Sequence, residues 1–320
     1  MPKSQKRRRT FSLLEGDVFE KLQRYPDGHF DLVITSPPYN IGKIYERGTK
    51  LDLDTYVAWL NKVIDLLARK IKKTGSICWQ VGNYIDDGEV FPLDVLFYPT
   101  FKKNNLQLRN RIVWHFNFGL HSSKRLSGRY ETILWFSKTE RFKFNNDAIR
   151  VPQLYPGKRH SGKKNGHAGK LSGNPLGKNA TDFWTFSAED HFCEQGIWEL
   201  PNVKANHPEK TIHPCQFPLE LVERCVLAFT DPGDLVLDPF VGAGTSVVAA
   251  LKHDRLAIGI DKDPAYLTIA RDRITSLRNG TLKARPLGKP IPRPNPKDKV
   301  AALPTEWKLL RARDDEIGHA

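Results

Sequence analysis

Apolar positions along the chain repeat with two different periods, and segments of the two kinds alternate. Residues 54–71 (DTYVAWLNKVIDLLARKI) place apolar side chains three and four positions apart, which predicts an amphipathic helix. Short apolar runs bounded by turn residues predict buried strands. These runs are FSLLEGD (11–17), FDLVITS (30–36), the end of KKTGSICWQVG (72–82) after its turn, RIVWHFNFGL (111–120) and RYETILWFSK (129–138), with a helical stretch, VFEKLQRYPDG (18–28), between the first two. This alternation predicts an α/β fold, a largely parallel sheet with helices on both faces.

The alternation returns near the C-terminus. Residues 217–230 (FPLELVERCVLAFT) have helical spacing, with Pro218 expected in the first turn. Residues 231–274 follow as strand, glycine-rich loop, helix, strand, acid and helix, which together make a βαβ unit. The Pro- and Lys/Arg-rich residues beyond about 280 predict a tail without compact structure of its own.

A segment of different character lies between the two periodic regions. Residues 156–178 (PGKRHSGKKNGHAGKLSGNPLGK) hold six Lys or Arg, two His, six Gly and no acid. Such a composition buries too little apolar surface to form a core. The segment is either a mobile surface loop or a flexible basic segment that wraps DNA and orders on binding. The charge of the whole chain favours DNA, with Lys158, Arg159, Lys163 and Lys164 as candidate contacts.

The overall charge balance points to a polyanionic partner. The 320 residues include 50 Lys and Arg against 36 Asp and Glu, a formal net charge of +14. Four cysteines without C-x-x-C spacing indicate a reducing compartment, with neither a disulfide framework nor a zinc site. No apolar run approaches membrane-spanning length, and the basic start MPKSQKRRRT lacks the apolar stretch of a secretory signal. We therefore expect no membrane partner and no metal.

A glycine-rich motif, DPFVGAGTS (238–246), follows an apolar strand, and its glycines let the backbone approach a ligand closely. Asp261 ends the next strand, where a cofactor ribose would present its hydroxyls. A nicotinamide-dependent dehydrogenase is the rival interpretation. However, the loop lacks the third Gly of G-x-G-x-x-G, and the Asp238 carboxylate would repel a pyrophosphate. S-adenosylmethionine (AdoMet), which carries sulfonium and ammonium groups and no phosphate, fits better.

A second motif, TSPPYN (35–40), ends the strand at residues 30–36. Its two prolines stop the strand and hold a stiff, extended corner, because proline lacks a backbone N–H and fixes φ. The simpler interpretation is a strand-ending loop whose tyrosine packs against the core.

TSPPYN followed by DPFVGAGTS resembles the catalytic and cofactor motifs of the DNA amino-methyltransferases, which methylate cytosine N4 or adenine N6. Their order is similar to that of the β-class enzymes of restriction-modification type, over roughly residues 11–275. The resemblance implies a Rossmann-like, doubly wound core with an inserted basic target-recognition segment. It also implies AdoMet as cofactor and double-stranded DNA with a flipped base as substrate.

The resemblance further implies roles for single residues. Ser36, Pro37, Pro38 and Tyr39 stand in the catalytic tetrapeptide. The cofactor-binding candidates are Asp17 near the adenine, Pro214, Gln216 and Phe217 at the methionine end, Asp238, Phe240, Gly242, Gly244 and Thr245 in the AdoMet loop, and Asp261 at the ribose. Many relatives have Lys-Pro where this chain has His213-Pro214, which puts a lysine contact there in doubt.

The tetrapeptide could overcome a specific chemical difficulty of the methyl transfer. An exocyclic amino group is a poor nucleophile because its lone pair is delocalised into the ring. The Ser36 hydroxyl and the Pro37 carbonyl would accept its two hydrogens and free the lone pair for attack on the sulfonium methyl. Tyr39 would stack on the base, which must leave the duplex to be reached.

The target base and the class of acceptor are less constrained by the sequence. In this family a serine-led tetrapeptide goes more often with cytosine N4 and an aspartate-led one with adenine N6. Ser36 therefore favours cytosine N4, with adenine N6 as the alternative. Methylation of RNA or protein is a weaker alternative because of the long basic segment, and a non-catalytic DNA-binding module is weaker because both motifs are intact.

These interpretations predict five consecutive parts. They are a basic arm (1–10), a catalytic half (11–140), a target-recognition insertion (141–205), an AdoMet-binding half (206–278) and a Pro-rich basic tail (279–320). The expected setting is the cytoplasm, bacterial or with a phage-encoded chain, in association with the nucleoid. A cognate restriction endonuclease and a homodimer are left open as further partners.

Overall fold

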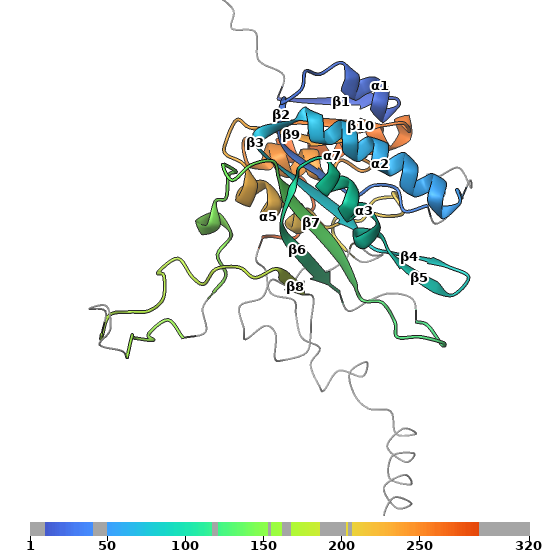
Figure 1. Ribbon diagram of the computed structural model, residues 1–320. Helices are drawn as coiled ribbons and strands as arrows, with labels where there is room; N and C mark the ends of the chain where they lie inside the picture. Colours follow the sequence, from blue (N-terminus) through green and yellow to red (C-terminus); the bar gives the residue numbers. More distant parts are fainter. Residues whose placement is uncertain are drawn as a thin grey trace, which may run out of the picture. The chain divides into compact units, whose positions relative to one another are not determined.

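The central element of the chain is an eight-stranded sheet with strand order β1-β10-β9-β2-β3-β7-β6-β8 (Figure 1). The computed structural model describes residues 10–40, 50–116, 121–152, 155–161, 168–185, 203 and 207–287. The strands are β1 (Phe11–Glu15), β2 (Phe30–Thr35), β3 (Ile71–Val81), β6 (Gln107–His115), β7 (Tyr130–Ser137), β8 (Phe183–Thr185), β9 (Leu235–Asp238) and β10 (Leu256–Asp261). Among them, β7 alone runs antiparallel to its neighbours.

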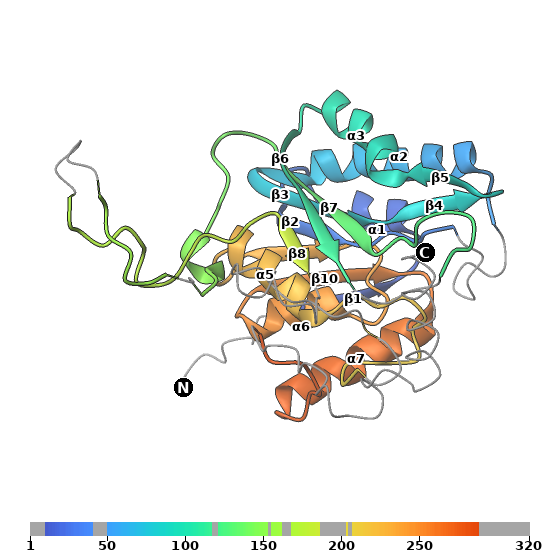
Figure 2. The same ribbon diagram turned by 90° about the horizontal axis from the view of Figure 1, so that it is seen from below.

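Helices cover both faces of this sheet, as Figure 2 shows. One layer holds α1 (Val18–Gln23), α2 (Leu53–Lys70) and α3 (Leu93–Lys103), and the other holds α5 (Leu219–Phe229), α6 (Thr245–Lys252) and α7 (Pro264–Arg278). Side chains of alternate residues in the central strands pack against opposite helix layers. Val33 packs on the α1–α3 side, and Leu32 and Ile34 pack on the α5–α7 side. The predicted doubly wound, mostly parallel α/β fold is confirmed.

The order of the strands determines where a ligand can bind. β9 and β2 pair in parallel at the centre of the sheet, with Val236 opposite Leu32 and Leu237 opposite Val33. From β9 the chain continues through α6 to β10 on one side, and from β2 through α2 to β3 on the other. Sheets of this kind bind ligands outside the carboxyl ends of the strands at such a switch point. Both sequence motifs begin there.

The structure differs from the sequence prediction in local details. Residues 72–75, expected as a turn, lie inside β3, where the register shifts from Phe30↔Ile71 to Leu32↔Ser76. Pro218 is the N-cap of α5 and not part of its first turn. The sequence prediction also missed α3, which contains Pro99, and the hairpin of β4 (Asn83–Asp86) and β5 (Glu89–Pro92). A 3-10 helix, η2 (Asn146–Ile149), completes the elements of the described chain.

The basic segment, expected to be flexible, has backbone pairing in its described parts. Arg159 lies opposite Leu171 in an antiparallel bridge. His160 N donates to Lys170 O over 3.0 Å, and Ser172 N donates to Lys158 O over 2.8 Å. This pairing was not predicted from composition, because ladder hydrogen bonds use backbone groups and need no apolar side chains.

We expect Gly244→Ala to destabilise the fold much more than Gly280→Ala. Both glycines have positive φ, +77° and +69°, so both substitutions strain the backbone by about 1 kcal/mol. Only at Gly244 would the new Cβ meet a neighbour, at 2.6 Å from Ala270 Cβ of α7. We expect a total loss of about 3 kcal/mol there, measured by urea unfolding. Equal losses for the two variants would contradict the close approach of α6 and α7.

Candidate active site

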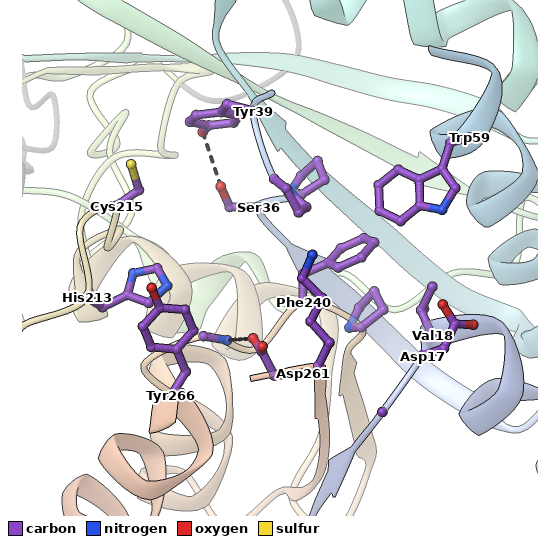
Figure 3. A pocket seen from close by; sticks show the side chains of 16 residues that line it. Asp17, Val18, Ser36, Tyr39, Trp59, His213, Cys215, Phe240, Asp261 and Tyr266 are labelled. Atoms are coloured by element: carbon purple, nitrogen blue, oxygen red, sulfur yellow. Dashed lines mark hydrogen bonds between the residues drawn. The ribbon is translucent and has the colours of Figure 1, made fainter. Parts of the chain in front are cut away.

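A pocket of about 800 Å³, counted with its open mouth, lies at the carboxyl ends of the central strands (Figure 3). Its walls combine the turn after β2 with the turn after β9, which are about two hundred residues apart in the sequence. The lining residues are Gly16, Asp17, Val18, Ser36, Pro37, Pro38, Tyr39, Trp59, His213, Cys215, Pro239, Phe240, Gly242, Asp261, Lys262 and Tyr266.

Asp238 lies behind this pocket and joins its two halves. Its carboxylate accepts hydrogen bonds from Thr35 Oγ1 at 2.7 Å, Ser246 Oγ at 2.5 Å and Phe240 N at 3.0 Å. Burial raises the pKa of Asp238 to about 6, against the lowering effect of the donors. Because the side chain is only 1% exposed and does not line the pocket, its visible role is to position the turn.

Asp261 holds the glycine turn from the other side. Its Oδ2 accepts from Gly242 N and its Oδ1 from Asp263 N, both at 2.9 Å. Burial raises the pKa of this carboxyl. A side chain at residue 242 would place its Cβ 2.8 Å from His213 Nε2, and φ there is +46°, so glycine is needed at the position.

Aromatic rings lie on both sides of the pocket. The rings of Trp59 and Phe240 lie 5.7 Å apart, and Asp17 is the N-cap of α1, accepting from Phe19 N at 2.8 Å. In Figure 3, Trp59 and Asp17 lie on one side of Phe240, and His213 with Tyr266 on the other. The last two rings are 4.4 Å apart. Burial is the main reason that the pKa of His213 is lowered to about 4, and the positive charges of Lys210 and Arg273 contribute to the lowering. This imidazole is therefore neutral near pH 7.

The Ser-Pro-Pro-Tyr turn is held by groups on both sides. Tyr56 of α2 donates its hydroxyl to Pro38 O over 2.7 Å. Ser36 Oγ donates to the Tyr39 hydroxyl over 3.1 Å, which leaves the serine oxygen able to accept (Figure 3). Among the described residues no group donates to Pro37 O. The turn, whose residues line the pocket, therefore has two oxygens that can still accept a hydrogen bond.

The sequence profile of a DNA methylase family, the N6 and N4 methyltransferases, matches residues 30–272, which include both motifs. The type II methyltransferase M.BglII of Bacillus subtilis is 43% identical over 271 residues, which cover 84% of this chain and 70% of the relative. The chain belongs to this DNA methylase family. The resemblance noted from the two motifs is confirmed.

Solved structures of DNA methyltransferases share the fold of this DNA methylase. The cytosine-N4-specific PvuII DNA methyltransferase aligns with a TM-score of 0.60 at 21% identity, over 87% of this chain and 94% of its own. A Thermus thermophilus protein assigned as a DNA modification methylase, solved with S-adenosyl-L-methionine, aligns with a TM-score of 0.55 at 25% identity, over 83% and 94%. The Rossmann-like core is thus confirmed.

The pocket of this DNA methylase contains some of the predicted site residues but not others. The residues brought together are Asp17, Ser36, Pro37, Pro38, Tyr39, Phe240, Gly242 and Asp261. The predicted residues outside the lining are Pro214, Gln216, Phe217, Asp238, Gly244 and Thr245. Gln216 is bonded within its own loop, to Glu209 O and Thr211 Oγ1, and Thr245 Oγ1 accepts from Arg273 at 2.8 Å. Their roles in binding stay predictions.

The remaining predictions concern DNA, metals and membranes. Lys158 and Arg159 lie in the paired part of the basic segment, and Lys163 and Lys164 lie outside the described residues. In the described part of the chain, no group of three or more His, Cys, Asp or Glu could hold a metal ion. No described helix is both long and apolar enough to cross a membrane.

Sequence reasoning missed Glu131 and Gln80, which contact the catalytic turn. Glu131 Oε2 lies 3.3 Å from the Tyr39 hydroxyl and also accepts from Gln80 Nε2. Burial raises the pKa of Glu131 to about 7, although hydrogen bonds from Tyr39 and Gln80 lower it. In the sequence, Glu131 is recognisable only as an acid beside the apolar run TILWF of β7. Its contact with Tyr39 could not be predicted, because the pairing of β7 with β3 brings the two residues together.

We expect Glu131→Gln to make the protein more stable above pH 7. The folded-state pKa of Glu131 is about 7, above the ordinary value of 4.5. Its contribution to stability is therefore fully present below pH 4.5 and lost as pH rises through 7, where the partly buried group ionises. Glutamine keeps the hydrogen bonds and does not ionise. Urea unfolding at pH 4 and pH 8 should show a gain of about 1–2 kcal/mol at pH 8 only; a variant less stable at pH 8 would contradict the raised pKa.

Proposed function

We propose that this protein transfers a methyl group from AdoMet to the exocyclic amino group of a base flipped out of double-stranded DNA, and that the base is cytosine, methylated at N4. One observation supports this above the others. A single pocket contains both the Ser36–Tyr39 turn, with its hydrogen-bond acceptors, and the Gly242–Asp261 pair. The family supports the reaction class, and Ser36 at the head of the tetrapeptide supports cytosine N4.

AdoMet fits the residues that line this pocket. Asp17 and Asp261 outnumber Lys262 among the lining residues, and this net negative charge suits a ligand with positive charge and disfavours a pyrophosphate. Asp261 would hold the ribose hydroxyls, and the apolar rings of Trp59 and Phe240 would pack on the adenine. Asp238, expected from the sequence to repel a pyrophosphate, does not line the pocket, so the acids that would repel a pyrophosphate are Asp17 and Asp261. The Thermus relative solved with AdoMet supports the same cofactor.

The chain's own residues would activate the nucleophile. The bound cofactor supplies an electrophilic methyl group on a sulfonium sulfur. Ser36 Oγ and Pro37 O would accept the two amino hydrogens and withdraw the nitrogen lone pair from the ring. The contacts from Tyr56 to Pro38 and from Thr35 to Asp238 hold these acceptors in register with the cofactor turn. The ring of Tyr39, which lines the pocket, would stack on the flipped base.

A methyl-transfer assay tests the proposal directly. The protein would be incubated with labelled AdoMet and unmethylated genomic DNA, and the DNA digested to nucleosides for mass spectrometry. N4-methylcytosine is the expected product. N6-methyladenine would keep the reaction class and overturn the choice of base. Label found only in RNA or protein would overturn the DNA substrate, and AdoMet binding without transfer to any acceptor would overturn the enzyme.

Tyr39→Ala and Asp261→Ala should separate the two halves of the site. Loss of a stacking ring is worth about 1–3 kcal/mol per base, so Tyr39→Ala should lower turnover about 10- to 100-fold and leave the Kd for AdoMet unchanged. Asp261→Ala should instead weaken AdoMet binding, measured by calorimetry. If Tyr39→Ala abolishes AdoMet binding, the stacking role is wrong.

The basic segment should contribute to DNA binding through phosphate contacts. Each contact adds about 0.9 to the slope of log K against log salt, so the Lys158→Gln/Arg159→Gln double variant should reduce the slope by about 2. Lys102→Gln/Lys103→Gln, at the exposed end of α3, is the matched control and should leave it unchanged. Equal slopes for the two double variants would assign residues 158–159 to a solvated surface.

Partners beyond DNA follow from the family alone. A cognate restriction endonuclease, a homodimer and association with the nucleoid stay predictions. The relative M.BglII is named a type II methyltransferase, which supports looking for an endonuclease gene beside this one.

A further inference from the structure

A chain of hydrogen bonds leads from Ser36 into the sheet. Ser36 Oγ donates to the Tyr39 hydroxyl over 3.1 Å. That hydroxyl lies 3.0 Å from Gln80 Oε1 and 3.3 Å from Glu131 Oε2. Gln80 Nε2 donates to the same Glu131 oxygen. The chain therefore begins at a residue that lines the pocket and ends at a carboxylate whose residue does not.

Glu131 is an unusual residue for this position. It lies at the start of β7, opposite Trp114 of β6. In the described part of the chain no Lys, Arg or His forms an ion pair with it, and the hydrogen bonds that lower its pKa come from neutral groups. A carboxylate so placed lowers stability, and a glutamine could make the same hydrogen bonds to Tyr39 and Gln80. Packing and hydrogen bonding alone therefore do not account for an acid here.

The proposed reaction provides a use for the acid. As the amino nitrogen bonds to the methyl carbon, the sulfonium C–S bond breaks and its electron pair stays on sulfur as a neutral thioether. The positive charge moves to the nitrogen, which then holds one hydrogen too many. A neutral methylated base forms only when that proton leaves.

We propose that Glu131 is the final acceptor of this proton, relayed through the hydroxyls of Ser36 and Tyr39. Ser36 Oγ takes the proton from nitrogen and passes its own to the Tyr39 oxygen, and Tyr39 passes its own to Glu131. The charges balance: one cationic sulfonium and one carboxylate become a neutral thioether and a neutral carboxylic acid. The inference rests on the proposed function and adds a destination for the proton.

The groups that face Glu131 fit this relay. They are Tyr39 from the catalytic turn, Gln80 from β3, the neutral ring of Trp114 in register on β6 and, beyond Tyr39, Cys215. Burial raises the pKa of Tyr39 well above its ordinary value of 10, so the phenol can pass a proton but does not hold a negative charge near pH 7. The raised pKa of Glu131, about 7, suits a base that must accept a proton and release it again.

Glu131→Gln tests the proposal in single-turnover methyl transfer on a DNA duplex, followed from pH 5.5 to 9. The wild-type rate constant should rise with pH through about 7 and reach a plateau, because only ionised Glu131 accepts a proton. The variant should be about 100-fold slower on the plateau and should lack this rise. The Kd values for AdoMet and for DNA should change less than about twofold.

Tyr39→Phe is the second variant, because it keeps the ring for stacking and removes the middle hydroxyl of the relay. It should also lose the rise through pH 7, with a rate about tenfold lower. Glu140→Gln is the matched control: its carboxylate is 73% exposed and paired with Arg109 at 3.0 Å. This variant should keep the wild-type rate and pH profile.

The other outcomes overturn the proposal. A Glu131→Gln protein with the wild-type rate and pH profile would show that the proton leaves elsewhere. Loss of DNA or AdoMet affinity without a change in the single-turnover rate would make Glu131 a binding or structural group. A Tyr39→Phe protein that keeps the pH dependence would remove Tyr39 from the route. If wild-type protein methylates no DNA base in the same series, the proposed function fails first.

Discussion

The hydrogen bond from Thr35 to Asp238 is the contact on which the site depends. It crosses the centre of the sheet between residues 203 positions apart, and each of them immediately precedes a functional turn. The Asp238 carboxylate also fixes Ser246 and the backbone of Phe240. Since parallel pairing of β2 and β9 keeps their carboxyl ends level, one buried carboxylate sets the position of the acceptor turn relative to the cofactor turn.

The acidic side chains in and behind the pocket lower the stability of the folded protein when they are ionised. Burial raises the pKa of Asp238, Asp261 and Glu131, so all three acids are less stable as anions in the folded protein than in water. Asp238 and Asp261 recover part of this loss through donors that shape the turn. Among the described residues, the groups that donate hydrogen bonds to Glu131 are the neutral Tyr39 and Gln80. Perturbed acids gathered in a cleft are typical of functional sites.

Much of the site was predictable because its residues belong to short motifs. Pro37 and Pro38 restrict the local backbone themselves, and the positive φ of Gly242 and Gly244 requires glycine. The conformation of these stretches can therefore be predicted without tertiary information. A motif does not show which of its members face a ligand. Gly244, for example, belongs to the glycine loop but approaches Ala270 of α7, not the pocket.

The sequence by itself determined the alternation of strands and helices, the family and the two turns, because each depends on periodicity or backbone restriction over a few residues. Tertiary structure alone decided that Asp238 lies behind the pocket, that Trp59, His213 and Tyr266 line it, and that Glu131 reaches Tyr39. These relations depend on strand order and register. Strand order joins residues far apart in the chain, and no local pattern encodes such distances.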